Sequence, residues 1–259
     1  MKQAIRQMLS AYDGFFKLGK GFPKFKSKKN EQSALFPCEA ISKSNTFETK
    51  HISLIKSLKN LKFRCSNLYF DRLRRYKDNI KSATLSKTKS GKFYLSVLIS
   101  MNEEEFKQFR HTNNKVGIDL GVKYFIITSD GEVFENKHFF KRTEDKIKKL
   151  QRQFSKKVKG SNNRNKARIR LAKVFEHLIN QKIDYINSVV SSLLRTYDYV
   201  FMENLNVQGM MKNHHLSKAI QELGFYTFKS ILNNKAMLTD GLQVRRRVII
   251  VVISIRSLN

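Results

Sequence analysis

This sequence has few cysteines, prolines and acidic residues. It contains two cysteines, Cys38 and Cys65, two prolines and no tryptophan. Two cysteines can form neither a disulfide framework nor a four-cysteine zinc site, so we expect buried, inert thiols in a reducing cytoplasm. The N-terminus lacks a signal-peptide pattern, and no apolar run approaches the roughly 20 residues of a membrane span. We therefore predict a cytoplasmic protein without a membrane partner.

The scarcity of acids leaves a large positive charge. Lys and Arg total 51 against 21 Asp and Glu, which gives a formal charge of +30 on 259 residues. Such a surplus predicts a polyanionic partner, because each neutralised phosphate releases condensed counterions. A basic solubility surface or an anionic membrane surface is the alternative. The charge, together with 20 Phe and 9 Tyr, favours nucleic acid, and the apolar fraction of 41% is sufficient for a folded core.

The first 30 residues predict a helix followed by a basic loop. Apolar side chains recur at three- and four-residue spacing up to Phe16 and should need a partner surface. In "GKGFPKFKSKKN", lysines that can contact phosphates alternate with rings that can stack on bases. A solvated lysine loop pinned by two core phenylalanines is the alternative. The predicted nucleic-acid contacts are Lys20, Phe22, Lys24, Phe25, Lys26, Lys28 and Lys29.

Residues 31–112 predict a small antiparallel β domain. "IKSATLSKTKSGKFYLSVLIS" has the alternation of two strands around a turn, with Phe93, Leu95 and Val97 on one face. "NTFETK", "HISLIKS" and "LKFRCS" are shorter strand candidates. An antiparallel sheet or small barrel would pack such strands. The polar segment "MNEEEFKQFRHTNN" should be the linker into the second half.

Residues 113–236 predict a second domain with three strands, two helices and a fourth strand. The first strand carries Asp119, and the fourth, in "YDYVFMENLNVQGM", ends in Glu203. This is the element order of an RNase H-like core, so the predicted fold is α/β (α+β overall), with a small antiparallel β domain before it. The long second helix begins with basic turns, where we predict nucleic-acid contacts from Arg164, Lys166 and Arg168.

Asp119 and Glu203 are the candidate catalytic and metal-binding residues. The first and fourth strands of such a core lie side by side, so the two carboxylates should converge. Paired carboxylates can hold Mg²⁺, which polarises a scissile phosphate, and without a cation they would repel each other. The alternative is that Asp119 caps a turn and Glu203 pairs with a lysine.

The sequence resembles the TnpB (OrfB) family of insertion-sequence proteins. The resemblance rests on "GFPKFKSKK", "GIDLGVKYFIITSDG", "GSNNRNKARIRLAKVFEHLINQKIDYINSVVSSLL" and "YDYVFMENLNVQGMMKNHHLSKAI", and it covers about residues 1–236. It implies a bacterial or archaeal, transposon-encoded, RNA-guided DNA endonuclease associated with the nucleoid. Its partners would be guide-type RNA and DNA, and its metal would be Mg²⁺.

The resemblance also implies a role for each part of the chain. Asp119 and Glu203 match the first two acids of the family's RuvC nuclease site, within a RuvC domain at residues 113–236. Residues 1–30 match a remnant of the helical recognition region, and residues 31–112 match the wedge-like β domain that binds guide RNA. The usual N-terminal strands are missing, so the resemblance predicts a chain truncated at both ends.

The sequence departs from the family pattern after Glu203. That pattern calls for a zinc ribbon with two Cys-x-x-Cys pairs and for a third catalytic Asp. No cysteine follows Cys65, so we expect no zinc, and the only later acids are Glu222 and Asp240. We expect Asp240 to lie in an anomalous tail, residues 237–259, rather than on a matching helix. The expected function is nucleic-acid binding with impaired cleavage.

The tail ends in "RRRVIIVVISIRSLN" and is compatible with a frameshift. Codons can be chosen for Arg247 to Ile253 so that the frame from the third base encodes Cys-Asn-Asn-Cys-Gly-Tyr. This is the spacing of a zinc ribbon, so we prefer a frameshifted remnant, in a decayed copy of the gene, to a genuine strand "VIIVVISI". The alternative functions are a non-catalytic RNA- or DNA-binding regulator of the parent element and, less favoured, a basic structural protein of the ribosomal type.

Overall fold

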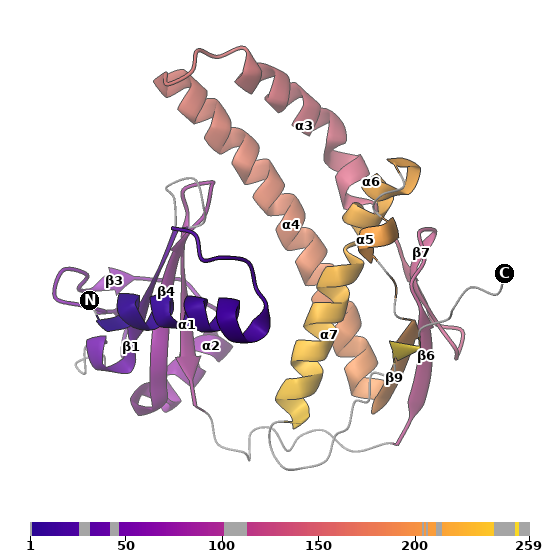
Figure 1. Cartoon of the computed structure of the whole chain (residues 1–259), viewed down its shortest axis with the longest axis horizontal. Helices are drawn as coiled ribbons and strands as arrows, with labels where there is room; N and C mark the ends of the chain where they lie inside the picture. The colour runs from indigo at the N-terminus through magenta and orange to yellow at the C-terminus, as the bar shows by residue number, and fades with distance from the viewer. Residues whose placement is uncertain are drawn as a thin grey trace. The chain divides into compact units, whose positions relative to one another are not determined.

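The structure is a computed structural model of the chain and consists of two compact units, residues 1–102 and 103–259 (Figure 1). It describes residues 2–25, 32–41, 47–100, 113–203, 205, 207–210, 214–240 and 252–253. The division falls within the segment that we expected to be a linker. Each hydrophobic core is built from residues of one unit only.

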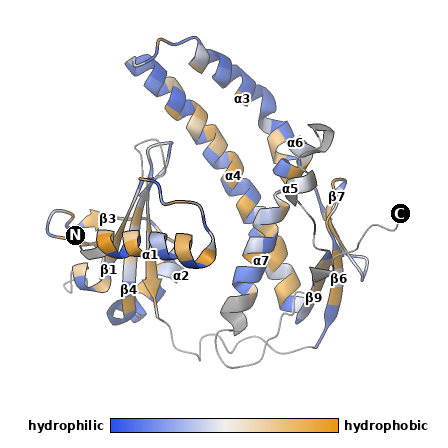
Figure 2. Cartoon of the chain, in the orientation of Figure 1, coloured by the Kyte–Doolittle hydropathy of each residue, from blue (hydrophilic) through white to orange (hydrophobic). Residues whose placement is uncertain are grey.

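The first unit begins with helix α1, Lys2–Leu18, which carries the apolar stripe expected from the sequence (Figure 2). Much of that stripe is exposed, including Met8, Leu9 and Phe16. The helix ends at Gly19, whose φ of +61° suits glycine, and the amide of Lys20 donates to the carbonyl of Gly14 at 3.1 Å.

A three-stranded antiparallel sheet forms the centre of the first unit, in the order β1-β4-β5. Its strands are β1 Gln32–Pro37, β4 Ile80–Lys87 and β5 Phe93–Ile99. Two-residue strands β2 His51–Ile52 and β3 Leu61–Lys62 form a separate pair. The remaining elements are the short helices η1 Cys38–Ala40 and η2 Lys77–Asn79 and the helix α2 Asn67–Arg75. The predicted β4–β5 hairpin is confirmed.

Two expectations for the first unit are wrong, and one helix was not predicted. The described part of "NTFETK", residues 47–50, forms no strand, and the buried ring of Phe47 anchors this segment in the core instead. Helix α2 was not expected, because its sequence is mostly polar; Ser66 caps it by accepting from the amide of Tyr69 at 3.4 Å. Neither thiol is fully buried, because Cys38 lies exposed in the turn after β1 and Cys65 is half-buried.

The second unit contains a five-stranded mixed sheet in the order β10-β9-β6-β7-β8. Its strands are β6 Lys115–Asp119, β7 Tyr124–Thr128, β8 Val133–Glu135, β9 Tyr199–Glu203 and β10 Val252–Ile253. Strands β6, β7 and β8 are antiparallel neighbours, whereas β9 pairs with β6 in parallel. The predicted adjacency of the first and fourth strands is therefore confirmed.

The described residues of the second unit form the helices α3 Phe139–Ser155, α4 Asn162–Thr196, α5 Val207–Met210, α6 His214–Leu223 and α7 Phe225–Asp240. Helices α3 and α4 pack side by side as a long hairpin (Figure 1). The C-terminal half of α4 packs with α7, and Val190 and Phe228 are fully buried there in the core that also holds Ile126 of β7. No helix in the described part of the chain is both long and apolar enough to cross a membrane.

The alternation of the strands determines which face of the sheet carries the candidate acids. Val116 and Ile118 of β6, like Val200 and Met202 of β9, are buried in the core under the helices. Because successive side chains in a strand point to opposite faces, Asp119 and Glu203 belong to the other face. Both residues are exposed.

Two expectations about the C-terminal region are corrected. Val252 and Ile253 form the strand β10, which pairs in parallel with Met202 and Glu203 of β9, so the preference against a genuine strand is wrong at these two residues. Among the described strands, β10 alone pairs with this edge of β9, and a β-branched segment suits such pairing. Asp240 is the last residue of α7 and so lies on a helix. The frameshift stays a prediction about the gene.

Candidate metal centre

Asp119 and Glu203 end two neighbouring parallel strands. Ile118 is paired with Met202, so the next residue on each strand is one of the two acids. Adjacent strands lie about 4.8 Å apart, which places the two carboxylates within reach of a shared cation. They border a hollow of about 410 Å³ whose floor includes Gly117, Phe201 and Ile127.

The surroundings of the two carboxylates leave them available. Across the described residues, neither side chain forms a hydrogen bond or an ion pair. The alternative in which Glu203 pairs with a lysine thus has no support there. Thr128 and Ser129 also line the hollow, whose walls are mostly apolar, so the oxygen donors there are the two carboxylates. The donors are hard oxygens, the type that Mg²⁺ prefers, and one or two carboxylates suffice when water and phosphate complete the coordination.

Other acids of the second unit have structural partners. The carboxylate of Asp130 accepts from the hydroxyls of Ser129 at 3.0 Å and Tyr197 at 2.8 Å. The hydrogen bond to Asp130 raises the pKa of Tyr197. Asp198 is buried and accepts from the amide of Asn113 at 2.6 Å. The described residues contain no group of three or more His, Cys, Asp or Glu that could hold a metal ion.

Glu222, one of the two acids after Glu203, caps a helix. Its Oε1 accepts from the backbone amides of Phe140 at 3.0 Å and Lys141 at 3.4 Å, in the first turn of α3. A carboxylate is favourable there, because the first amides of a helix have no partner within the helix. Beside it, Lys182 donates to the carbonyl of Gln221 at 2.7 Å. Burial lowers the pKa of Lys182, and the charge of Glu222 opposes that shift.

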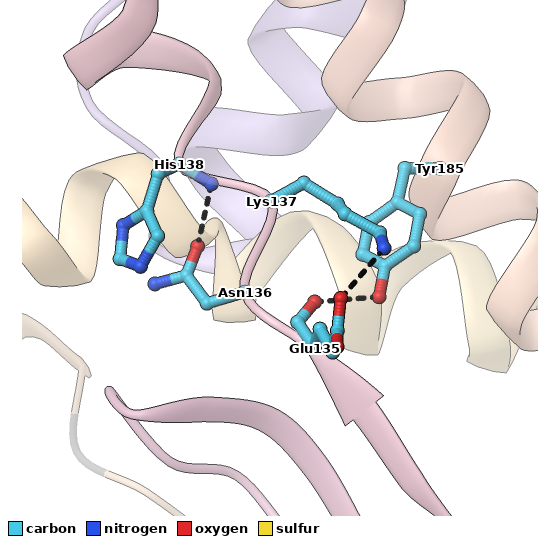
Figure 3. A network of polar contacts seen from close by, with 5 residues as sticks. All are labelled: Glu135, Asn136, Lys137, His138 and Tyr185. Atoms are coloured by element: carbon cyan, nitrogen blue, oxygen red, sulfur yellow. Dashed lines mark hydrogen bonds and ion pairs between the residues drawn. The ribbon is translucent and has the colours of Figure 1, made fainter.

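A polar network after β8 fixes the start of α3 against α4 (Figure 3). The hydroxyl of Tyr185 donates to the carbonyl of Glu135 at 2.6 Å, and Lys137 forms an ion pair with the Glu135 carboxylate at 2.9 Å. The hydrogen bond and charge of Lys137 lower the pKa of Glu135. The amide of His138 donates to Asn136, and His138 adopts a φ of +46°. The chain thereby turns sharply from the sheet into the helical hairpin.

The predicted nucleic-acid contacts near the N-terminus are only partly described. Lys20, Lys24 and Phe25 are exposed. Phe22 is 62% exposed and packs edge-on against Phe15 and Tyr12, so neither it nor Phe25 is the core phenylalanine that the alternative expected. Lys26, Lys28 and Lys29 lie outside the described residues.

The tip of the α3–α4 hairpin is strongly basic. Residues 149–175 contain 10 Lys and Arg and no acid. Lys166 and Arg170 line a hollow of about 430 Å³ together with Lys156 and Lys157. Arg168 is exposed and donates to its neighbour Asn165.

Arg164 has a structural role at this tip. Its guanidinium donates to the carbonyl of Lys157 at 2.6 Å and lies 4.3 Å from the centre of the Phe154 ring. These contacts hold the turn between the two helices. Lys166 and Arg168 present their charges outward, whereas Arg164 is committed to the turn.

Part of the sequence matches a known protein family. The chain is a two-unit protein whose second unit has a mixed sheet. The two acids that end β6 and β9 make it a candidate metal-binding protein. Residues 96–214 match the OrfB family model described as "Probable transposase". This match covers less than half of the chain, and within it the sequence is similar to that family.

Two curated relatives span a greater length than this chain. A protein of Streptomyces pristinaespiralis named "Putative RNA-guided DNA endonuclease" is 27% identical over 235 residues, which cover 91% of this chain and 56% of the relative. Another, of Escherichia coli (strain K12), named "Putative RNA-guided DNA endonuclease InsQ", is 29% identical over 257 residues, with coverages of 93% and 60%. The chain therefore corresponds to less than two thirds of either relative's length.

A solved structure gives a weaker match. One chain of the Cas12f1–sgRNA–target DNA complex, solved by cryo-electron microscopy, aligns with a TM-score of 0.35 and 10% identity, covering 96% of this chain and 63% of that one.

Proposed function

We propose that this chain is a transposon-encoded nucleic-acid-binding protein with an RNase H-like (RuvC-type) second unit. In this proposal, Asp119 and Glu203 hold a divalent metal ion, with Mg²⁺ as the physiological one. Guide-type RNA and DNA are its partners, as the names of its relatives suggest for those proteins. DNA cleavage by this chain is weak or absent.

The observation that carries the proposal is the register of β6 and β9. It sets two exposed carboxylates side by side at the ends of parallel strands, next to a hollow and without other partners among the described residues. Two unpaired carboxylates at this spacing repel each other, and a cation removes that repulsion. When bound, a divalent ion would polarise a phosphate and lower the pKa of a coordinated water.

Weak cleavage is proposed because the metal centre offers two carboxylates and one of the two later acids serves another purpose. Glu222 caps α3 through two backbone amides. Asp240 is the last residue of α7. With two carboxylates, the alignment of an attacking water relies on fewer fixed ligands, and small misplacements cost large factors in rate.

Nucleic-acid binding is proposed for the basic tip of the α3–α4 hairpin and for the exposed Lys and Phe residues near the N-terminus. The run of 10 cations at the tip, without an acid, attracts phosphates. Phe25 is fully exposed and can stack on a base.

A non-catalytic regulator of the parent element is the second candidate. It is favoured by the number of basic residues that do not belong to the metal centre. In that case, replacing Asp119 and Glu203 would change neither RNA binding nor DNA cleavage.

One experiment separates these functions. RNA binding and Mg²⁺-dependent DNA cleavage are measured for the unaltered chain and for the Asp119→Ala, Glu203→Ala double variant. We expect unchanged RNA binding in both, and a trace of cleavage only in the unaltered chain. No cleavage in either would favour the regulator, and efficient guide-dependent cutting would refute the proposed impairment.

A further inference from the structure

A chain of hydrogen bonds links the strands that carry the two candidate acids. The hydroxyl of Tyr197, just before β9, donates to Asp130 at 2.8 Å. The hydroxyl of Ser129 donates to the other oxygen of Asp130 at 3.0 Å. The same Ser129 oxygen accepts from the amide of Gly117 in β6 at 3.1 Å. These hydrogen bonds therefore connect the start of β9, through the β7–β8 turn, to β6.

This series of hydrogen bonds is anchored at both ends. Tyr197 is buried in the core, and its backbone amide caps α4 by donating to the carbonyl of Leu193 at 2.9 Å. At the other end, the amide of Ser129 donates to the carbonyl of Gly117 at 2.8 Å, which closes a two-way link with β6. Asp130 has one hydrogen bond on each carboxylate oxygen, so it joins the two anchored groups.

We infer that Asp130 and Tyr197 are positioning residues, which fix β6 against β9 so that Asp119 and Glu203 face the same hollow. A slip of one residue between paired strands turns every side chain to the opposite face. Gly117 lies two residues before Asp119, and Tyr197 lies two residues before the first residue of β9. The link therefore attaches to β6 and to the start of β9, within a few residues of each acid.

The link also connects to the hollow itself. Ser129 and Gly117 line it together with the two acids. Outer partners that orient metal ligands are known to influence metal affinity as well as ligand geometry. Asp130 and Tyr197 would therefore affect metal binding without touching the ion. This inference rests on the proposed metal site.

The test measures Mn²⁺ affinity, by the electron paramagnetic resonance signal of free Mn²⁺, at a temperature where all variants are folded. We expect Tyr197→Phe and Asp130→Ala each to weaken Mn²⁺ binding about tenfold. The double variant should be no weaker than the worse single variant, because both changes break one link. Asp130→Asn, which keeps one acceptor oxygen, should fall between Asp130→Ala and the unaltered chain.

Matched controls are available on the same unit. Tyr226→Phe changes an exposed tyrosine, and Asp145→Ala changes an exposed acid of α3. Both should bind Mn²⁺ like the unaltered chain. Amide hydrogen exchange should accelerate in β6 and β9 of the Tyr197→Phe variant but not in the controls. A purely stabilising role would change the melting temperature and leave Mn²⁺ affinity in the folded state untouched.

The outcomes distinguish this inference from the proposed function. If Asp119→Asn abolishes Mn²⁺ binding while Tyr197→Phe and Asp130→Ala bind within twofold of their controls, the inference is overturned and the metal site stands. If the unaltered chain does not bind Mn²⁺, or Asp119→Asn binds equally well, the proposed metal site fails and the inference falls with it.

Discussion

Glu222 shows how a single side chain can join elements far apart in the sequence. Its carboxylate accepts from amides at the start of α3, 82 and 81 residues away. The sequence does not reveal this contact, because an isolated acid on an amphipathic helix looks like part of a solvated face. The Ser129–Asp130–Tyr197 link was missed for the same reason, since Asp130 and Tyr197 are 67 residues apart.

Removing the Glu222 carboxylate should destabilise the second unit. Glu222→Ala leaves the amides of Phe140 and Lys141 without their acceptor, and a lost helix cap costs about 1 kcal/mol. Glu222→Gln keeps an acceptor oxygen and should cost less. Urea unfolding followed by far-ultraviolet circular dichroism measures both, with Gln221→Ala, an exposed neighbour, as the control. Equal stability of Glu222→Ala and Gln221→Ala would contradict the capping role.

Lys182 should make stability depend on alkaline pH. Burial lowers its pKa below the ordinary value of 10.5, with Glu222 acting in the opposite direction. Between the lowered pKa and 10.5, the unfolded chain binds a proton that the folded chain does not, so the free energy of unfolding increases with pH. Below the lowered pKa, both states are protonated and the contribution is constant.

The comparison with Lys182→Met isolates this effect. The difference in the free energy of unfolding, unaltered chain minus variant, should be flat near neutral pH and rise toward pH 10.5, as measured by urea unfolding across that range. A difference that decreases with pH would contradict the assigned direction of the pKa shift.

At the scale of elements, alternation and helical spacing predicted most of the sheet strands and both long helices. The β4–β5 hairpin and strands β6 to β9 were found because their side chains alternate between core and solvent. Asp119 and Glu203 were found as a pair because the order of strands predicted that β6 and β9 adjoin. Helix α2 was not found, because its first turn and capping Ser66, rather than an apolar stripe, define it. Strand β10 depends on pairing with β9, which no local pattern encodes.

The basic hairpin tip should determine the salt dependence of nucleic-acid binding. Lys166→Ala and Arg170→Ala each remove a cation from the hollow at the tip. Each phosphate contact that is lost should reduce the slope of log K against log salt by about 0.9 for duplex DNA. Fluorescence anisotropy over a range of salt concentrations measures this slope.

Lys148→Ala is the matched control for the tip, because Lys148 is already paired with Glu144 at 3.0 Å. Its slope should stay close to that of the unaltered chain. Equal slopes for Lys166→Ala, Arg170→Ala and Lys148→Ala would show that the tip does not contact phosphates.

At the scale of the whole molecule, the two hydrophobic cores share no residue. Leu54 is fully buried in the first core and Phe228 in the second. Leu54→Ala should cost about 3 kcal/mol and Phe228→Ala about 4 kcal/mol, each in its own unit only. Hydrogen exchange followed by mass spectrometry should show loss of amide protection confined to residues 1–102 for Leu54→Ala and to residues 103–259 for Phe228→Ala. Loss of protection in both units from either change would contradict their independence.

The central claim is that Asp119 and Glu203 together bind a divalent metal ion. Isothermal titration of Mg²⁺ into the unaltered chain and into the Asp119→Asn, Glu203→Gln double variant tests it most directly, with Asp145→Asn, Glu132→Gln as a control of equal charge. The account predicts one Mg²⁺ site in the unaltered chain and the control, and none in the double variant. Equal Mg²⁺ binding by all three proteins would contradict it.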